Sequence, residues 1–309
     1  MTIGRMHGIY GVKLGASVIG AVGRTALRTG TEVRQEATSG EVYARFQAIY
    51  AQKPMAEFQT RQLATALGAC ALTGVALTSS APLIVYAQKH AEGGTRTSGS
   101  NHRAFVINEG LMIPRRLTVE HQGDAVIDYE VLATYDGTNE PIAPAESQAL
   151  PALSDDNERF TLGGTTLHNG SSAFSFPQIR RLEIDFGIAA ETVGADSDIW
   201  DTACRIAEIL PSIRQAGIDT EWFKATVCPL TGLNIGHSGT KIFLKKRAAG
   251  GTFVADVTAQ HIKFTAAGLA VIEGLEGAGS GLKECSLVMP LRFDGTNNPI
   301  TINTASAIS

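Results

Sequence analysis

The chain contains the same turn sequence twice. Residues 136–142 read DGTNEPI and residues 294–300 read DGTNNPI, at an offset of 158 (294 − 136). Asp-Gly favours a tight turn because Gly accepts positive φ and the Asp side chain accepts hydrogen bonds from nearby backbone amides. A turn that recurs half a chain length later indicates that the chain is built from two similar units.

The strand before each turn repeats as well. Every second residue from 127 to 135 is apolar, and so is every second residue from 285 to 293. These positions hold Ile127, Tyr129, Val131, Ala133 and Tyr135 in the first unit, and Cys285, Leu287, Met289, Leu291 and Phe293 in the second. Strand side chains alternate between faces with period two, and a chance match would not preserve the face. The sequence therefore predicts a duplication.

Shorter matches place the units along the chain. CALTG at 70–74 matches CPLTG at 228–232 at offset 158, whereas VKLGAS at 12–17 matches FTLGGT at 160–165 at offset 148. The difference predicts about ten extra residues in the second unit, around GIAAETVGADSD at 187–198. Residues 143–158 carry prolines and an acidic cluster, which favour an exposed connector. We therefore predict domains at 1–150 and 151–309.

Hydrophobic periodicity predicts mainly strands. Residues 30–50 are expected to form a long hairpin that turns near residues 38–40, with one packed and one charged face. The same alternation at 179–188 predicts its counterpart. Helices are expected at 59–67 and at 197–210, where Ile199, Ala203, Ile206 and Leu210 recur at spacings of three and four. Strands are also expected at 83–88, at 105–107 running into 111–119, and before each DGTN turn. The predicted class is mainly β with a small α content: two tandem β-sandwich or barrel domains, each with one flanking helix.

Composition excludes several classes of protein. A hydrophobic content of 44% and a charged content of 18% indicate a globular chain, and a net charge of −4 disfavours a protein that binds nucleic acid by neutralising phosphates. The uncharged stretch at 62–88 is long enough to cross a membrane, but Pro82 and a Ser pair divide it, so no membrane segment is predicted. The four cysteines form no C-x-x-C pair and are expected to be free thiols in a reducing cytoplasm: Cys70, Cys204, Cys228 and Cys285.

No catalytic pattern emerges. The chain has no phosphate-binding loop, zinc-protease motif or nucleophile elbow, and the glycine-rich stretch at 274–281 is expected to be a turn. His102 and His261 recur near strand starts, where packing or surface placement is the better interpretation. Asp155, Asp156 and Glu158 are interpreted as a solvated linker in preference to a cation site. We predict no enzyme activity, no catalytic residue, no metal and no cofactor.

Hairpins with one charged face need neighbours for their open edges. Closing such hairpins into a ring removes the edges, and a large ring leaves an aqueous channel. A head-to-tail interface that closes by rotation forms rings, so three two-unit chains would present 3 × 2 = 6 similar positions.

With these features the sequence resembles the tail tube proteins of long non-contractile-tailed (siphovirus-like) bacteriophages, in their two-domain form. The resemblance rests on the opening stretch LGASVIGAVGRTALRTGTEVRQEATSGEVYARFQAIYAQKP, the helix expected after it, and the repeated strands that end in DGTN-x-PI. It implies a structural virion protein: a homotrimeric, pseudo-hexameric ring that stacks into a tube through which DNA is ejected. It also implies candidate lumen or ring-interface residues: Glu32, Arg34, Glu36, Glu41, Arg45, Arg181, Glu183 and Asp185.

The implied partners are further copies of the chain and the tail terminator, tape measure and tail-tip proteins. DNA would pass without specific binding, and the particle would assemble in the host bacterial cytoplasm. Two alternatives stay open at this point. One is a tube-like ring protein of the tail tip or baseplate, and the other is a twin-domain β enzyme or carbohydrate-binding protein with a site between its domains.

Overall fold

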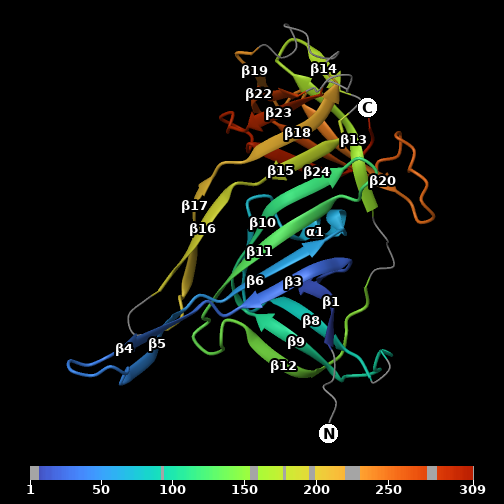
Figure 1. Ribbon diagram of the computed structural model, residues 1–309. Coiled ribbons are helices and arrows are strands. Elements are labelled where there is room, and N and C mark those ends of the chain that lie inside the picture. Colours follow the sequence, from blue (N-terminus) through green and yellow to red (C-terminus); the bar gives the residue numbers. More distant parts are fainter. Residues whose placement is uncertain are drawn as a thin grey trace.

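The computed structural model describes residues 7–91, 94–153, 159–176, 179–194, 199–219, 230–276 and 284–308. Over this part of the chain there are twenty-four strands and one short helix, which confirms the predicted mainly β class (Figure 1). The first half contains β1 (His7–Leu14), β2 (Ser17–Ile19), β3 (Val22–Arg28), β4 (Thr31–Glu36), β5 (Phe46–Gln52), β6 (Met55–Thr60), α1 (Leu63–Ala69), β7 (Val75–Leu77), β8 (Leu83–Lys89), β9 (His102–Ile107), β10 (Glu109–Glu120), β11 (Val126–Thr134) and β12 (Ala143–Gln148). The second half contains β13 (Arg159–His168), β14 (Ala173–Phe176), β15 (Arg181–Asp185), β16 (Ile188–Val193), β17 (Ala203–Ile209), β18 (Ser212–Asp219), β19 (Leu233–Ile235), β20 (Lys241–Arg247), β21 (His261–Ala266), β22 (Gly268–Glu276), β23 (Glu284–Pro290) and β24 (Ile300–Ser306).

One ten-stranded sheet runs through both halves of the chain. Its order is β19-β22-β23-β18-β15-β10-β11-β6-β3, with β7 paired to β10 beside this path. Each half adds a five-stranded sheet, β12-β9-β8-β1-β2 in the first and β14-β13-β20-β21-β24 in the second. Two separate hairpins, β4–β5 and β16–β17, project from the body on the same side (Figure 1).

The strand pairing of the first half recurs in the second, residue by residue. Leu117 lies opposite Ile127 in the β10–β11 pair, and Leu275 lies opposite Cys285 in the β22–β23 pair, at an offset of 158 (275 − 117). Even the irregularities coincide, because the register shifts between Pro114 and Arg116 in β10 and 158 residues later (272 − 114) in β22. The two hairpins share one register at offset 157 (188 − 31).

The core lies beneath the ten-stranded sheet. In β11 every second side chain is buried, as the alternation predicts, and Tyr129 is 1% exposed. The buried side chains form one cluster that draws on both halves, for example Val85 of β8 and Phe264 of β21. This shared core and the continuous sheet join the two units closely, and the division near residue 150 stays a prediction.

The helix prediction holds for the first unit and fails for the second. α1 has good helix formers, and its Leu63, Ala66 and Leu67 are buried on one face, although it starts later than expected because residues 55–60 form β6. The second expected helix is wrong, since Ala203–Ile209 is strand β17, paired with β16. Tertiary pairing overrides the helical spacing there. The position equivalent to α1, residues 221–227, lies outside the described residues.

Three other expectations are corrected. The counterpart of the hairpin at 30–50 is β16–β17, whereas residues 181–185 correspond to β3. The extra residues of the second unit do not lie at 187–198, because Leu14 lies opposite Ser17 whereas the equivalent Thr166 lies opposite Ser175, so they lengthen the β13–β14 turn. The expected connector begins as strand β12, paired with β9, while residues 154–158 lie outside the described part.

The two DGTN turns have the same hydrogen bonds. Asp136 Oδ1 accepts the backbone N–H groups of Thr138 at 2.8 Å and Asn139 at 2.6 Å. Asp294 Oδ1 accepts those of Thr296 at 2.9 Å and Asn297 at 2.6 Å. These donors stabilise the ionised carboxylate, so the Asn297 side chain and the backbone amides lower the pKa of Asp294 to about 2, and the pKa of Asp136 is lowered for the same reason.

We expect the carboxylates of these turns to contribute stability only when ionised. The pKa of Asp294 falls from 3.8 to about 2 on folding, so its contribution is present above pH 3.8 and is lost as the pH falls through about 2. The double variant Asp136→Asn/Asp294→Asn keeps acceptor oxygens without the charge and should show a flatter decline of denaturation midpoint between pH 5 and pH 2. A decline as steep as that of the wild type would contradict this assignment.

Gly187 forms the corner between β15 and β16 and has φ +58°, and an added Cβ would overlap the carbonyl oxygen of Leu210. Gly187→Ala should lower the free energy of unfolding by about 2 kcal/mol or more, because strain and overlap act together. Gly137→Ala has φ +84° and open space, and Gly164→Ala has neither problem. Urea denaturation should rank the three variants in that order, and equal midpoints would refute the corner argument.

Candidate assembly interface

The two halves of the chain are joined by the pairing of β15 with β10. Arg116 lies opposite Asp185, and the pairing continues to Glu120 opposite Arg181. β15 is the edge strand of the second unit, and it pairs with the outer side of a strand of the first. This junction is head-to-tail, because the two units contribute different edges to it.

The same two edges are left open at the ends of the chain. β3 is the counterpart of β15, and its strand pairing within the described residues is to β6 alone. β22 is the counterpart of β10, and along its described residues 271–276 it pairs only with β23, since β19 covers just Gly268–Ala270. The chain therefore ends in one edge of each kind that its own junction joins (Figure 1).

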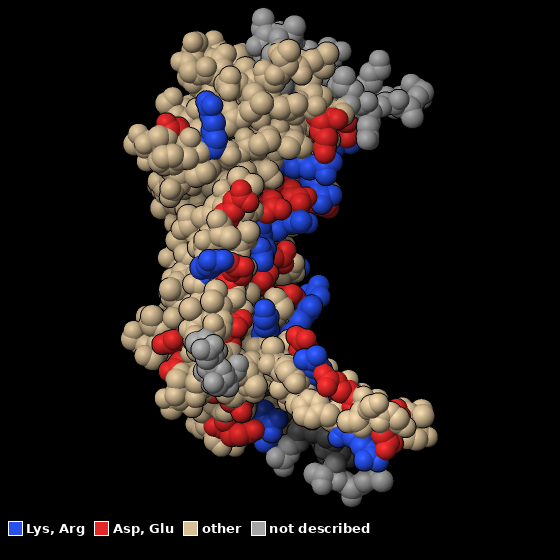
Figure 2. Space-filling view, turned by 90° about the vertical axis from the view of Figure 1, so that its left-hand side faces the viewer, with Lys and Arg blue, Asp and Glu red and all other residues tan. Residues whose placement is uncertain are grey.

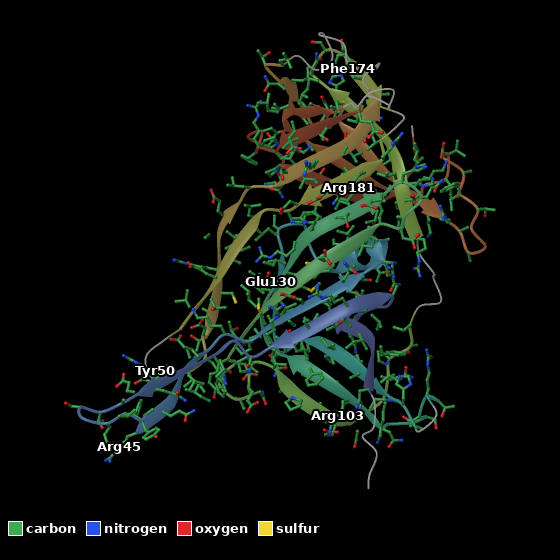
Figure 3. The ribbon with its side chains drawn as sticks, in the orientation of Figure 1. Arg45, Tyr50, Arg103, Glu130, Phe174 and Arg181 are labelled. Atoms are coloured by element: carbon green, nitrogen blue, oxygen red, sulfur yellow. The ribbon has the colours of Figure 1, made fainter. Side chains whose placement is uncertain are left out.

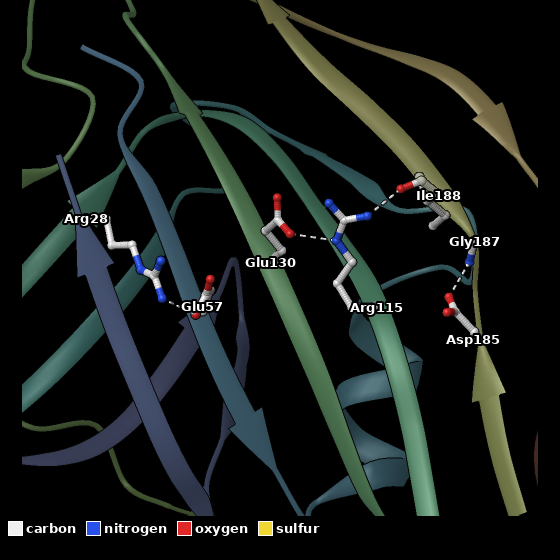
Figure 4. Close-up of polar contacts among 7 residues, drawn as sticks. All are labelled: Arg28, Glu57, Arg115, Glu130, Asp185, Gly187 and Ile188. Atoms are coloured by element: carbon white, nitrogen blue, oxygen red, sulfur yellow. Dashed lines mark hydrogen bonds and ion pairs between the residues drawn. The ribbon is translucent and has the colours of Figure 1, made fainter. Parts of the chain in front are cut away.

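Arg115 connects three elements at the junction. Its Nε donates to Glu130 Oε2 on β11 at 2.6 Å, and its Nη1 donates to the carbonyl oxygen of Ile188 at the start of β16 at 2.5 Å (Figure 4). Nearby, Asp185 Oδ1 accepts the backbone N–H of Gly187 at 2.9 Å. These contacts hold the corner where the second hairpin leaves the sheet.

Charged side chains of both signs cover the face of the ten-stranded sheet that is turned away from the core. Figure 2 shows them along the concave side of the molecule. The ion pairs on this face are Arg28–Glu57, Arg115–Glu130, Arg116–Glu183, Arg181–Glu120, Arg181–Glu183, Arg214–Glu273 and Arg180–Glu284. Positive and negative groups alternate across neighbouring strands, so the face carries paired charge and no large field of one sign.

The structure divides the eight residues predicted as lumen or interface into two groups. Glu32, Arg34 and Glu36 lie on β4, and Glu41 and Arg45 lie in the loop that follows it. Arg34 pairs with Glu36 at 2.9 Å, and Arg45 pairs with Glu41. Figure 3 shows Arg45 on the projecting hairpin, far from Arg181 on the sheet.

The other three predicted residues lie on β15 within the charged face. Arg181, Glu183 and Asp185 alternate with the buried Leu182 and Ile184, as the sequence predicts. Sequence reasoning left out further members of this face, among them Glu57, Arg115, Arg116, Asp128, Glu130 and Arg214. The alternation of β11 was a signal for Asp128 and Glu130, whereas Arg115 and Arg116 are neighbours in a bulged strand and follow no simple alternation.

The hairpin β4–β5 is exposed on both faces, which contradicts the expected packed face. Every residue of β4 is exposed. Large apolar side chains of the hairpin and its loop are exposed as well: Val33, Val42, Tyr43, Phe46, Ile49 and Tyr50. A cluster of this kind on a projecting element marks an interaction surface.

The two paired histidines are structural. His102 and His261 are buried, and each ring Nδ1 accepts a backbone N–H, from Lys89 at 3.1 Å and from Lys246 at 3.0 Å. This geometry confirms the predicted strand-end role. Cys70 and Cys285 are buried and free, burial raises the pKa of Cys70 to about 12, and Cys204 is free and partly buried.

Two hollows of moderate size lie on the body. One of about 260 Å³ on the charged face is lined by Glu57, Asp128 and Glu130 among others, and one of about 400 Å³ lies beside the β3 edge. In the described parts of the chain no cluster of His, Cys, Asp or Glu is placed to hold a metal ion. Asp155, Asp156 and Glu158 lie outside those parts. The described residues likewise include no helix with the length and apolar character to cross a membrane.

Comparison of the chain with models of known protein families gives no match, and comparison with curated proteins gives none. Any functional assignment therefore depends on the geometry of the edges, the hairpins and the charged face.

We expect Arg115→Ala to lower the free energy of unfolding by about 1–3 kcal/mol, because it leaves the Ile188 carbonyl and the largely buried Glu130 without this donor. Arg28→Ala is the matched control, since the Arg28 side chain is 55% exposed in its ion pair with Glu57. Its effect should stay within about 0.5 kcal/mol. Denaturant titration of both variants checks the difference, and equal losses would show that Arg115 does not hold the corner.

Proposed function

We propose that this protein is the ring subunit of a tail tube of a long non-contractile-tailed bacteriophage. In this proposal three chains close head-to-tail into a pseudo-hexameric ring, the rings stack, and DNA is ejected through the channel. The single observation that carries it is the match between the internal junction and the open ends. β15 pairs with β10 inside the chain, and their counterparts β3 and β22 are left for a neighbour.

Closure of the ring follows from repetition of one junction. If β3 of one copy pairs with β22 of the next as β15 pairs with β10, every unit has the same relation to its neighbour. A constant rotation between units closes into a ring or continues as a helix. The curved outline in Figure 2 favours closure, with the charged face turned inward.

The paired charges suit a channel for DNA. Arg115, Arg116 and Arg181 each have a carboxylate partner within ion-pair distance. A passing phosphate would have to compete with these carboxylates, so few counterions would be released and DNA would bind weakly. Such a surface lets DNA slide without sequence-specific contacts.

The alternative ring protein of the tail tip or baseplate shares the same junction and differs in stacking. The exposed apolar side chains of β4–β5 favour a body ring, because a stacked tube offers further surfaces to cover them. The terminator, tape measure and tip proteins remain the proposed partners at the ends of the tube.

A cysteine pair tests the proposed junction. Gly274 is the counterpart of Arg116 (274 − 116 = 158), and Arg28 is the counterpart of Asp185 (185 − 28 = 157). Arg28→Cys/Gly274→Cys should therefore form disulfides between copies, because directly opposed residues on antiparallel strands lie within reach. A Cβ at position 274 meets no atom within 4 Å. Covalent oligomers that end at a closed ring are the expected product.

The internal pair is the control. Arg116→Cys/Asp185→Cys has the same geometry within one chain, so its oxidation shows whether opposed cysteines at this register can bond. If the internal bond forms and the bond between copies does not at any protein concentration, the proposed ring is wrong. Negative-stain electron microscopy of the wild type then separates stacked tubes from single rings, the result expected of a tail-tip protein.

A further inference from the structure

We propose that the hairpin β4–β5 docks on the second unit of a neighbouring copy, with Tyr43 of one copy packed on Phe293 of the next. The proposal rests on the ring proposed above and adds a contact that strand pairing alone does not require. It follows from what the second hairpin does inside the chain.

The second hairpin reaches back over the first unit. Trp200, in the loop between β16 and β17, stacks on Tyr135 with ring centroids 5.1 Å apart. The backbone joins the same place, since Gln52 N donates to Ile199 O at 2.7 Å and Tyr135 N donates to Asp201 O at 2.9 Å. The hairpin loop is thus held by one aromatic contact and two backbone hydrogen bonds.

Each group in this contact has a counterpart that is exposed in the single chain. The hairpins share their register, so Trp200 corresponds to Tyr43 (200 − 43 = 157), and Tyr135 corresponds to Phe293 (293 − 135 = 158). Tyr43 is 81% exposed and Phe293 is 59% exposed. Val42, the counterpart of Ile199, is 89% exposed. The pattern of side chains is kept where no partner is present.

The partner must be a second copy. Figure 1 shows β4–β5 at one end of the molecule and β23, which precedes Phe293, toward the other. One chain cannot join them. A neighbour whose β22 pairs with β3 brings its own Phe293 to the place that Tyr135 occupies beside Trp200. One part of the contact is not repeated, because Ile209 replaces Gln52, whose Oε1 accepts from the Trp200 indole at 2.7 Å.

The backbone bonds predicted between copies follow directly. Ile209 N of one copy would donate to Val42 O of the next, and Phe293 N would donate to Ala44 O. The hollow of about 400 Å³ beside β3 is lined partly by Trp200 and Gln52, so the internal contact and the open edge adjoin each other. Hairpin docking and strand pairing would therefore act on the same neighbour.

A charge-pair rescue tests the contact. Tyr43→Lys and Phe293→Glu should each raise the concentration for half-assembly, measured by sedimentation velocity, by about tenfold or more, as expected when a buried aromatic contact is lost. The double variant should return to within about threefold of the wild type, because the new lysine and glutamate face each other at every interface. Val257→Lys is the control, an exposed apolar residue (86%) outside the contact.

The outcomes separate this contact from the ring itself. If both single variants assemble like the wild type while Arg28→Cys/Gly274→Cys still forms its bond between copies, the docking inference is overturned and the ring stands. If the double variant remains as weak as the single variants, Tyr43 and Phe293 do not meet and the inference fails. If the wild type forms neither assemblies nor that disulfide, the ring proposal fails first.

Discussion

The pairing of β15 with β10 is the interaction on which the rest of the structure depends. It turns two similar units into one ten-stranded sheet and places their smaller sheets over a common core. Backbone hydrogen bonds and buried apolar rows supply the stability of such a junction, whereas the exposed ion pairs above it contribute little each. Because the junction uses unlike edges, it leaves unlike edges at the two ends of the chain. Those ends make assembly the main question about the protein.

The duplication also allows the chain to serve as its own reference. Where a contact is made inside the chain, its counterpart between copies can be named to the residue. The second hairpin packs on the first unit through Trp200, while the first hairpin leaves Tyr43 exposed. An edge strand and an apolar hairpin without partners are liabilities for a monomer, since both invite association. In a closed ring the same features become specific, because only the matching edge offers the right register.

The hairpins show where reading the sequence succeeded and where it failed. Alternation placed Leu182 and Ile184 in the core and Arg181 and Glu183 on the charged face, since a pleated strand buried on one side leaves that pattern. Helical spacing of Ile199, Ala203, Ile206 and Leu210 misled, because the hydrogen bonds of β17 are made to β16 and its side chains have no helix-packing surface. The match of Val42-Tyr43 with Ile199-Trp200 at offset 157 (199 − 42) was present in the sequence and would have identified the second hairpin.

The sequence by itself determined the mainly β class, the duplication, the DGTN turns and the buried face of β11, since each depends on local chemistry or on a short period. Tertiary structure alone decided which edges pair and which stay open, because strand order depends on packing between segments more than a hundred residues apart, as Arg116 and Val22 in their places show. It alone grouped Arg115, Glu130 and Ile188, which come from three elements. It also separated the charges of the hairpin from those of the sheet. No period in the sequence encodes those distances.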